Sequence, residues 1–289
     1  MRNYTLEDAT REAMKKFNIK ALKRYGQNFL IDQKVLETIL NVAQVHKEDC
    51  ILEIGPGLGA MTRLLCEKAG KVVAVEIDRQ MVNALNINMS GWGNFKLINE
   101  DIMKLDIKNL MIENFGDRKC KVVANLPYYI TSPIIMKLLG DRLNLNSITL
   151  MVQKEVAERI AAKPRGKEYG VLSVAVQYYS IPRIIEIVPK TAFMPQPNVD
   201  SAVIHLLIRN EPPVSIKDEA MFFRVVRASF GHRRKTLLNS LHGSDLSLGK
   251  KDGEIILKKC GIEPKRRGET LSLEEFALLS DEISFFLKK

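Results

Sequence analysis

The segment Asn125-Leu126-Pro127-Tyr128 combines groups that can hold an amine. An apolar run at 120–124 precedes it, so we expect Asn125 at the carboxyl end of a buried strand, where open α/β sheets bind ligands. The Asn125 amide oxygen and the Leu126 carbonyl are both acceptors. With Pro127 fixing the turn, they can orient the lone pair of an exocyclic amine toward an electrophile, while Tyr128 stacks on the attached purine. This chemistry works by positioning and electrostatic preorganisation and needs no side-chain base.

A purely structural interpretation of this segment is also open. The proline can end the strand, and Ser132 can cap a helix whose first position is Pro133. A capping role does not explain an uncharged amide at the strand end. If the amine belongs to a base within an RNA structure, that base must leave its stack. Phe193, on a loop containing Pro195 and Pro197, is a candidate for its second stacking face, with core packing as the alternative.

A glycine-rich loop follows the apolar run at 50–54. Gly55, Gly57 and Gly59 allow a tight turn and close approach of the backbone to a ligand, which a Cβ would obstruct. Gly55, Gly57 and Ala60 also fit a dinucleotide-binding fingerprint, which alone does not distinguish a nicotinamide cofactor from S-adenosylmethionine.

Acidic residues end the next two predicted strands. Glu76 lies where a carboxylate can accept two hydrogen bonds from a ribose diol, and Asp101 can accept the amine of an adenine. Either residue alone could be a helix cap or a solvated loop residue. Together with the glycine loop, they predict an adenosyl site across three strand ends.

These residues must be positioned by a sheet. Short apolar runs alternate with amphipathic stretches at 60–70 and 132–143, which is typical of a parallel sheet covered by helices. The ranges 183–189 and 201–209 indicate a closing antiparallel pair. The predicted parallel strands are 50–55, 71–78, 95–101, 120–127 and 147–153.

The pattern changes to helices beyond residue 210. Ser272 and Glu275 form a capping box that begins the last of them. We therefore expect a first domain over 1–210, whose N-terminal stretch before Tyr25 could close over the cofactor, and a second domain over 211–289. The predicted helices lie at 218–230, 232–241, 253–261 and 272–289.

The composition of the chain limits which partners, cellular locations and metal sites we expect. The 289 residues carry 44 Lys and Arg against 34 Asp and Glu, a formal net charge of +10, which favours a polyanionic partner. No apolar run approaches the roughly 18 residues of a membrane span, and the charged N-terminal stretch does not resemble a secretion signal. The four cysteines and four histidines lack metal-binding spacing. We expect a cytoplasmic protein with reduced cysteines and no metal.

Basic residues gather in three segments. No acid occurs between Phe223 and Ser240, whereas an ordinary solvated helix face mixes both signs. We therefore favour phosphate contacts, which position an RNA without reading its sequence. The predicted RNA-binding residues are Arg224, Arg227, Arg233, Arg234 and Lys235, then Lys265, Arg266 and Arg267, with Lys163 and Arg165 in the first domain.

Six motifs, in order along nearly the whole chain, resemble the ribosomal RNA adenine dimethyltransferase family. They are GQNFLID (26–32), EIGPGLGAMT (53–62), VEID (75–78), NED (99–101), NLPY (125–128) and FMPQPNVDS (193–201). The resemblance implies a Rossmann-like α/β methyltransferase sheet with a small C-terminal helical domain, and S-adenosylmethionine as cofactor. A nicotinamide cofactor is disfavoured because hydride transfer does not call for NLPY. The implied cofactor residues are Asn28, Leu30, Gly55, Gly57, Glu76, Ile77, Asp101, Ile102 and Asn125.

The implied reaction is dimethylation of N6 on two adjacent adenosines in the 3′-terminal helix loop of small-subunit (16S) rRNA, late in subunit biogenesis. The stretches 224–241 and 261–276 resemble the small-subunit branch of the family. Two alternatives stay open: a large-subunit (23S) rRNA methyltransferase of the antibiotic-resistance branch, and a non-enzymatic RNA-binding assembly factor. We expect a monomer.

Overall fold

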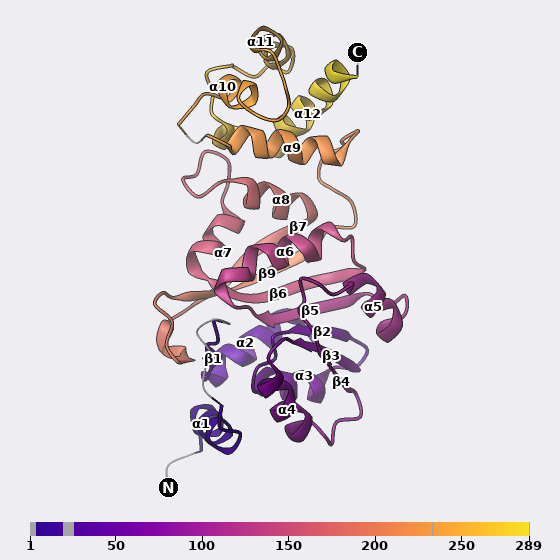
Figure 1. Ribbon diagram of the computed structural model, residues 1–289, viewed down its shortest axis with the longest axis vertical. Helices are drawn as coiled ribbons and strands as arrows, with labels where there is room; N and C mark the ends of the chain where they lie inside the picture. Colours follow the sequence, from indigo (N-terminus) through magenta and orange to yellow (C-terminus); the bar gives the residue numbers. More distant parts are fainter. Residues whose placement is uncertain (1–3, 20–25, 233, 289) are drawn as a thin grey trace. The chain divides into compact units, whose positions relative to one another are not determined.

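The computed structural model describes residues 4–19, 26–232 and 234–288 (Figure 1). The chain forms two compact units, the first comprising 1–157 and 181–208, the second 158–180 and 209–289. The second unit thus takes in residues 158–180, which the sequence pattern placed in the first domain. The reason is packing, because Tyr169, Val174 and Tyr178 belong to the same buried cluster as Phe222.

A seven-stranded sheet is the framework of the first unit (Figure 1). Its order is β4-β3-β2-β5-β6-β9-β7, with the first five strands parallel and β9 antiparallel to β6. The five predicted parallel strands are confirmed, and β7 and β9 are neighbours as expected. The bounds are β2 Cys50–Ile54, β3 Lys71–Glu76, β4 Phe95–Asn99, β5 Cys120–Asn125, β6 Leu145–Gln153, β7 Ser180–Val188 and β9 Ser201–Ile208.

The strand order reverses between β2 and β5. Strands β3 and β4 extend the sheet on one side of β2, and β5 and β6 extend it on the other. Connections after β2 and β5 therefore leave in opposite directions, which opens a crevice at the carboxyl ends of these strands. The glycine loop and Asn125 both lie at this edge.

Helices cover the sheet where apolar faces meet. Leu36 and Ile39 of α2 and Leu65 of α3 pack with Ile51 and Val123 of the strands in one buried cluster. In the described part of the first unit, aspartates begin three helices, since Asp32, Asp78 and Asp106 each accept a backbone N–H of the first turn. The bounds are α1 Leu6–Lys16, α2 Gln33–Ala43, α3 Ala60–Lys68, α4 Arg79–Asn88, α5 Ile107–Phe115 and α6 Thr131–Gly140.

A short two-stranded ladder accompanies the main sheet. Strand β1 (Phe29–Leu30) pairs antiparallel with β8 (Phe193–Met194), so that Leu30 lies opposite Phe193. Three single turns of 3₁₀ helix occur in the described chain at η2 (Tyr128–Ile130), η3 (Lys190–Ala192) and η4 (Gly268–Thr270).

The second unit is largely helical. The capping box of Ser272 and Glu275 is confirmed at the start of α12. The helix predicted over 232–241 begins only at Leu237, because Thr236 caps it. No helix in the described chain is long and apolar enough to cross a membrane. The bounds are α7 Lys154–Ala161, which runs across the division between the units, α8 Val171–Tyr179, α9 Glu219–Phe230, α10 Leu237–His242, α11 Lys250–Lys259 and α12 Leu273–Leu287.

Candidate active site

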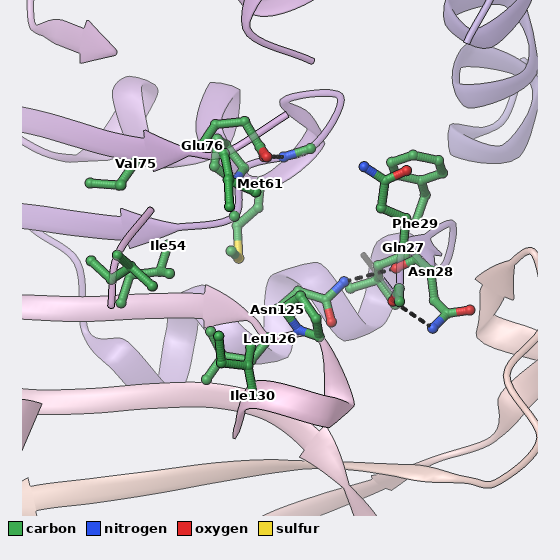
Figure 2. Close-up of a pocket in the computed structure, with 18 of the residues that line it drawn as sticks. Gln27, Asn28, Phe29, Ile54, Met61, Val75, Glu76, Asn125, Leu126 and Ile130 are labelled. Atoms are coloured by element: carbon green, nitrogen blue, oxygen red, sulfur yellow. Dashed lines mark hydrogen bonds between the residues drawn. The ribbon is translucent and has the colours of Figure 1, made fainter. Parts of the chain in front are cut away.

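A cavity lies at the carboxyl edge of the sheet in the first unit, where β2, β3 and β5 end (Figure 2). The fold brings distant residues together here, from the segment after α1 to the turn after β5. All but one of the predicted cofactor and catalytic residues line it. They are Asn28, Leu30, Gly55, Gly57, Glu76, Ile77, Asp101, Ile102, Asn125, Leu126, Pro127 and Tyr128.

Glycines shape one wall of the cavity. Gly57 has φ +57°, and a Cβ there would meet the ring of Phe29 at 3.3 Å. Gly59, with φ +87°, begins α3, and a Cβ there would lie 2.8 Å from Cδ2 of Leu85. Both positions need the left-handed backbone that glycine adopts without cost. The loop can therefore approach a ligand with its backbone.

Glu76 ties the end of β3 to the glycine loop. Its Oε2 accepts the N–H of Gly57 at 3.2 Å, and its Oε1 accepts the N–H of Asp78 at 2.9 Å. Burial raises the pKa of Glu76, while these backbone hydrogen bonds oppose the rise. Each carboxylate oxygen has a further lone pair for another donor. The side chain thus fits the predicted role of accepting hydroxyls from a ribose.

Asp101 lies just beyond β4. Its Oδ1 accepts the N–H of Met103 at 2.9 Å, which holds the carboxylate at the cavity wall. Ile77, half-exposed, and Ile102, buried, line the same region. Two apolar side chains beside a carboxylate suit a flat ring with an amine at its edge.

Asn125 is oriented by a backbone carbonyl from a distant segment. Its Nδ2 donates to the carbonyl of Asn28 at 3.1 Å, as Figure 2 shows. Because a carbonyl only accepts, the amide nitrogen must face Asn28, and Oδ1 points away from it. Among the described residues no donor reaches Oδ1. The amide oxygen is therefore available to accept an N–H from a ligand.

The turn after Asn125 is fixed by its own hydrogen bonds. The carbonyl of Pro127 accepts the N–H of Ile130 and the hydroxyl of Thr131. Neither bond uses the carbonyl of Leu126, the second acceptor that the sequence predicts. The proposed cap of Ser132 is wrong: α6 begins at Thr131, and no side chain caps it.

Phe193 does not line the cavity. Its pairing partner across the β1–β8 ladder is Leu30, and its ring is only 1% exposed within the buried cluster of the sheet. The alternative of core packing, and not the expected stacking face, describes this side chain in the structure. The physical reason is the ladder, which turns the aromatic ring inward.

Several lining residues were not predicted. Met61 and Ile130 contribute apolar walls, and Thr10 reaches the cavity from α1. Met61 belongs to a quoted motif, but its helical position gives no sign of which face it lines. Thr10 has no local signal at all, because its contact depends on where α1 packs.

Glu53 is a buried acid on β2, two residues before the glycine loop begins at Gly55. Neither of its carboxyl oxygens has a hydrogen-bond partner among the described residues, and the same holds for the hydroxyl of Thr62. Burial is the main cause that raises the pKa of Glu53 to about 8; the neighbouring Thr62 hydroxyl lowers it, and the charge of Glu76 adds to the rise. The native protein therefore holds Glu53 protonated at neutral pH.

Replacing Glu53 with glutamine should remove a pH dependence of stability. Between the ordinary glutamate pKa of 4.5 and the native value of about 8, the native state binds a proton that the unfolded chain releases, so stability falls as pH rises. Between pH 5 and pH 9 the resulting loss of stability is about 4 kcal/mol. Urea unfolding at pH 5 and pH 9 should show this loss in the parent chain and its absence in Glu53→Gln. The exposed Glu37→Gln serves as control, and an unchanged loss in Glu53→Gln would contradict the assignment.

Basic loops from three parts of the chain meet in the second unit. The N–H of Arg165 donates to the carbonyl of Glu269 at 2.7 Å, and the N–H of Leu237 donates to the carbonyl of Arg266 at 2.6 Å. These bonds hold segments 163–167, 234–236 and 265–269 beside one another. The exposed predicted residues are Lys163, Arg165, Arg227, Arg234, Lys235, Lys265 and Arg267, whereas Arg233 lies outside the described residues.

Two predicted RNA-binding arginines have structural partners instead. Arg266 forms a two-pronged pair with Glu275, with Nη2 at 2.9 Å from Oε2, and also donates to Thr270. Arg224 bonds both the carboxylate and the carbonyl of Asp245. Spacing could not show this, because the partners come from α12 and from the loop after α10.

This sheet order, with a glycine loop and strand-end carboxylates around a cavity, defines a methyltransferase that uses S-adenosylmethionine. The structure is similar to a dimethyladenosine transferase from Plasmodium falciparum, with a TM-score of 0.75, 25% identity, and coverage of 87% of this chain and 95% of that one. It also resembles the 23S rRNA methyltransferase ErmE, with a TM-score of 0.67, 25% identity, and coverage of 89% and 100%.

The family model described as ribosomal RNA adenine dimethylase matches residues 18–284, and the chain belongs to this family. It is 50% identical over 282 residues to a Geobacillus protein named ribosomal RNA small subunit methyltransferase A, covering 96% of this chain and 97% of that one. A Clostridium acetobutylicum protein of the same name is 48% identical over 274 residues, covering 95% and 98%. The nicotinamide alternative is thereby excluded.

Proposed function

We propose that this protein dimethylates N6 of two adjacent adenosines in the 3′-terminal helix loop of small-subunit (16S) rRNA, with S-adenosylmethionine as methyl donor. The observation that carries this proposal is the orientation of Asn125: its nitrogen is held by the carbonyl of Asn28, and no donor of the described residues occupies its amide oxygen at the cavity. Near-full-length similarity at about half identity to small-subunit methyltransferases supports the choice of RNA.

The chain's residues fit an adenosyl group. Gly55 and Gly57 leave room beside the backbone, Glu76 offers lone pairs to a ribose, and Asp101 offers acceptors to an adenine edge. When bound, S-adenosylmethionine supplies a methyl group on a positively charged sulfur. The carboxylates would hold it by its nucleoside.

The target amine is activated by position. An adenine amine is a weak nucleophile because its lone pair is delocalised into the ring. When its two N–H groups donate to Asn125 Oδ1 and to the Leu126 carbonyl, the amine nitrogen is favoured in a pyramidal form whose lone pair faces the methyl carbon. Tyr128 stacks on the extruded base, and the proton of the methylated amine passes to water.

RNA binding belongs to the basic loops of the second unit. Exposed lysines and arginines of segments 163–167, 234–235 and 265–267 form one positively charged group because backbone hydrogen bonds hold the segments together. Phosphate contacts of this kind position an RNA, and the shape of the subunit selects the site. Arg224 and Arg266 would support these loops more than contact phosphate.

In this proposal the protein acts as a monomer in the cytoplasm, late in the biogenesis of the small subunit. The presence of ribosomal RNA in the cytoplasm supports the location.

A methylation assay tests this function. Small subunits lacking the modification, the protein and labelled S-adenosylmethionine should give two dimethylated, adjacent adenosines near the 3′ end of 16S rRNA, mapped by primer extension. Modification of 23S rRNA instead would favour the antibiotic-resistance branch. Tight subunit binding without methyl transfer would favour an assembly factor.

Removing two exposed charges should weaken RNA binding in a salt-dependent way. Arg234→Gln with Lys235→Gln eliminates two proposed phosphate contacts, so the slope of log affinity against log salt should fall by about one unit per contact. Filter binding to small subunits from 50 to 300 mM KCl measures the slope. The pair Lys250→Gln and Lys258→Gln on α11 removes equal charge as control. Equal slopes for the two double variants would reject the assignment.

A further inference from the structure

A hydrogen bond links the catalytic turn to the last part of the sheet. The hydroxyl of Tyr128 lies 2.6 Å from Oγ of Ser201, seventy-three residues later in the chain. Ser201 is fully buried at the start of β9, whereas Tyr128 is partly buried and lines the cavity. The tip of a cavity-lining ring is therefore held by a side chain that does not itself line the cavity.

The serine is anchored to the strand that also fixes Asn125. Ser201 lies opposite Gln153 on β6, and Asn125 lies opposite Met151 on the same strand. The two positions on β6 are two residues apart, which corresponds to roughly 6.6 Å along a strand. Hydrogen bonding along β5, β6 and β9 thus sets the distance between the serine hydroxyl and the amide of Asn125.

The surroundings keep the hydrogen bond intact. Burial raises the pKa of Tyr128, and the negative charge of Asp200 raises it further, while the bond to Ser201 opposes the rise. The phenol therefore retains its proton at neutral pH and can donate to Ser201. Asp200 itself is held by the N–H of Lys190, which bonds its Oδ1 at 3.0 Å. The residue just before the serine is thus held in place as well.

We propose that Ser201 is a positioning residue for methyl transfer. By holding the phenol oxygen of Tyr128, it fixes where the ring lies relative to Asn125 Oδ1 and so fixes where a stacked purine presents its amine. This inference rests on the proposed function, in which Tyr128 stacks on the target adenine. Without this bond the ring could swing about the Cα–Cβ bond of Tyr128, and the stacked purine would present its amine out of line with the methyl carbon. Misplacement of this kind lowers the rate more than the binding affinity.

A double-mutant cycle tests the proposal. Ser201→Ala and Tyr128→Phe each remove the same hydrogen bond, and each should lower the single-turnover rate of methyl transfer about tenfold, the effect of one hydrogen bond. If the serine acts only through the tyrosine, the double variant should be no slower than Tyr128→Phe. Cofactor affinity by calorimetry and the apparent KM for the small subunit should stay within twofold.

Ser201→Thr keeps the hydroxyl on a strand-favouring residue and should restore most of the rate. If Ser201→Ala does not fold, Tyr128→Phe alone decides, because it breaks the bond without altering β9. A rate equal to the parent's in Tyr128→Phe, or full additivity in the cycle, would overturn the proposal. Absence of methyl transfer by the parent chain would instead refute the proposed function.

Discussion

Asn125→Ala should abolish detectable dimethylation while leaving RNA binding intact. The substitution removes the free acceptor Oδ1 and the donor that holds the carbonyl of Asn28. Loss of one preorganised group aimed at the reacting atoms costs about 10²–10³ in rate. Since the reaction needs two transfers to each adenosine, the yield of dimethylated product should fall further. Single-turnover methylation of small subunits, with product mapping by primer extension, measures the effect.

The matched control for Asn125 is Asn99→Ala. Asn99 ends β4, the edge strand of the same sheet, and its amide donates to the carbonyls of Glu76 and Ile77 without lining the cavity. We expect a modest loss of cofactor affinity there and a largely preserved rate at saturating cofactor. Filter binding should give the same subunit affinity for both variants. Normal dimethylation by Asn125→Ala would remove the central support for the proposed mechanism.

Glu76→Gln should weaken S-adenosylmethionine binding by at least about a hundredfold, although the side chain hardly changes size. Both carboxylate oxygens accept backbone N–H groups, from Gly57 and Asp78. A glutamine satisfies only one of these donors and places its NH₂ against the other. An unsatisfied buried N–H costs about 1–3 kcal/mol, and the lost charge-assisted bond to ribose adds to it. Isothermal calorimetry measures the affinity directly.

The control for Glu76 is Glu100→Gln, a nearby carboxyl that also lines the cavity and accepts one backbone N–H, that of Asp101, among the residues that the structure describes. The affinity of the Glu100→Gln variant for the cofactor should change less than threefold. Thermal unfolding without cofactor separates loss of binding from loss of fold. If Glu76→Gln binds the cofactor as the parent does, Glu76 is a structural clamp of the glycine loop and not a ribose ligand.

The strands and the glycine loop could be predicted because their signals are local. An apolar run such as 120–124 reports its own burial, and glycines such as Gly57 report a backbone conformation that other residues avoid. In a parallel sheet, all such strand ends meet at one edge. The predicted gathering of Glu76, Asp101 and Asn125 followed from this rule, and all three line the cavity.

Other features could not be predicted because they depend on partners far away in the sequence. Phe193 is buried because β8 pairs with β1, and Arg266 is occupied because α12 brings Glu275 to it. The segment 158–180 joins the second unit through the cluster around Phe222, which no local pattern reveals.

The sequence by itself determined the sheet, the cofactor loop, the amide at the strand end and the excess of positive charge, since each follows from residue type and spacing along a few neighbouring positions. Only the tertiary structure decided which charges are free, which aromatic ring faces the cavity, and that Ser201 holds Tyr128. Those outcomes depend on which side chains meet across the fold, and the energy of a hydrogen bond or ion pair depends on geometry that spacing does not contain.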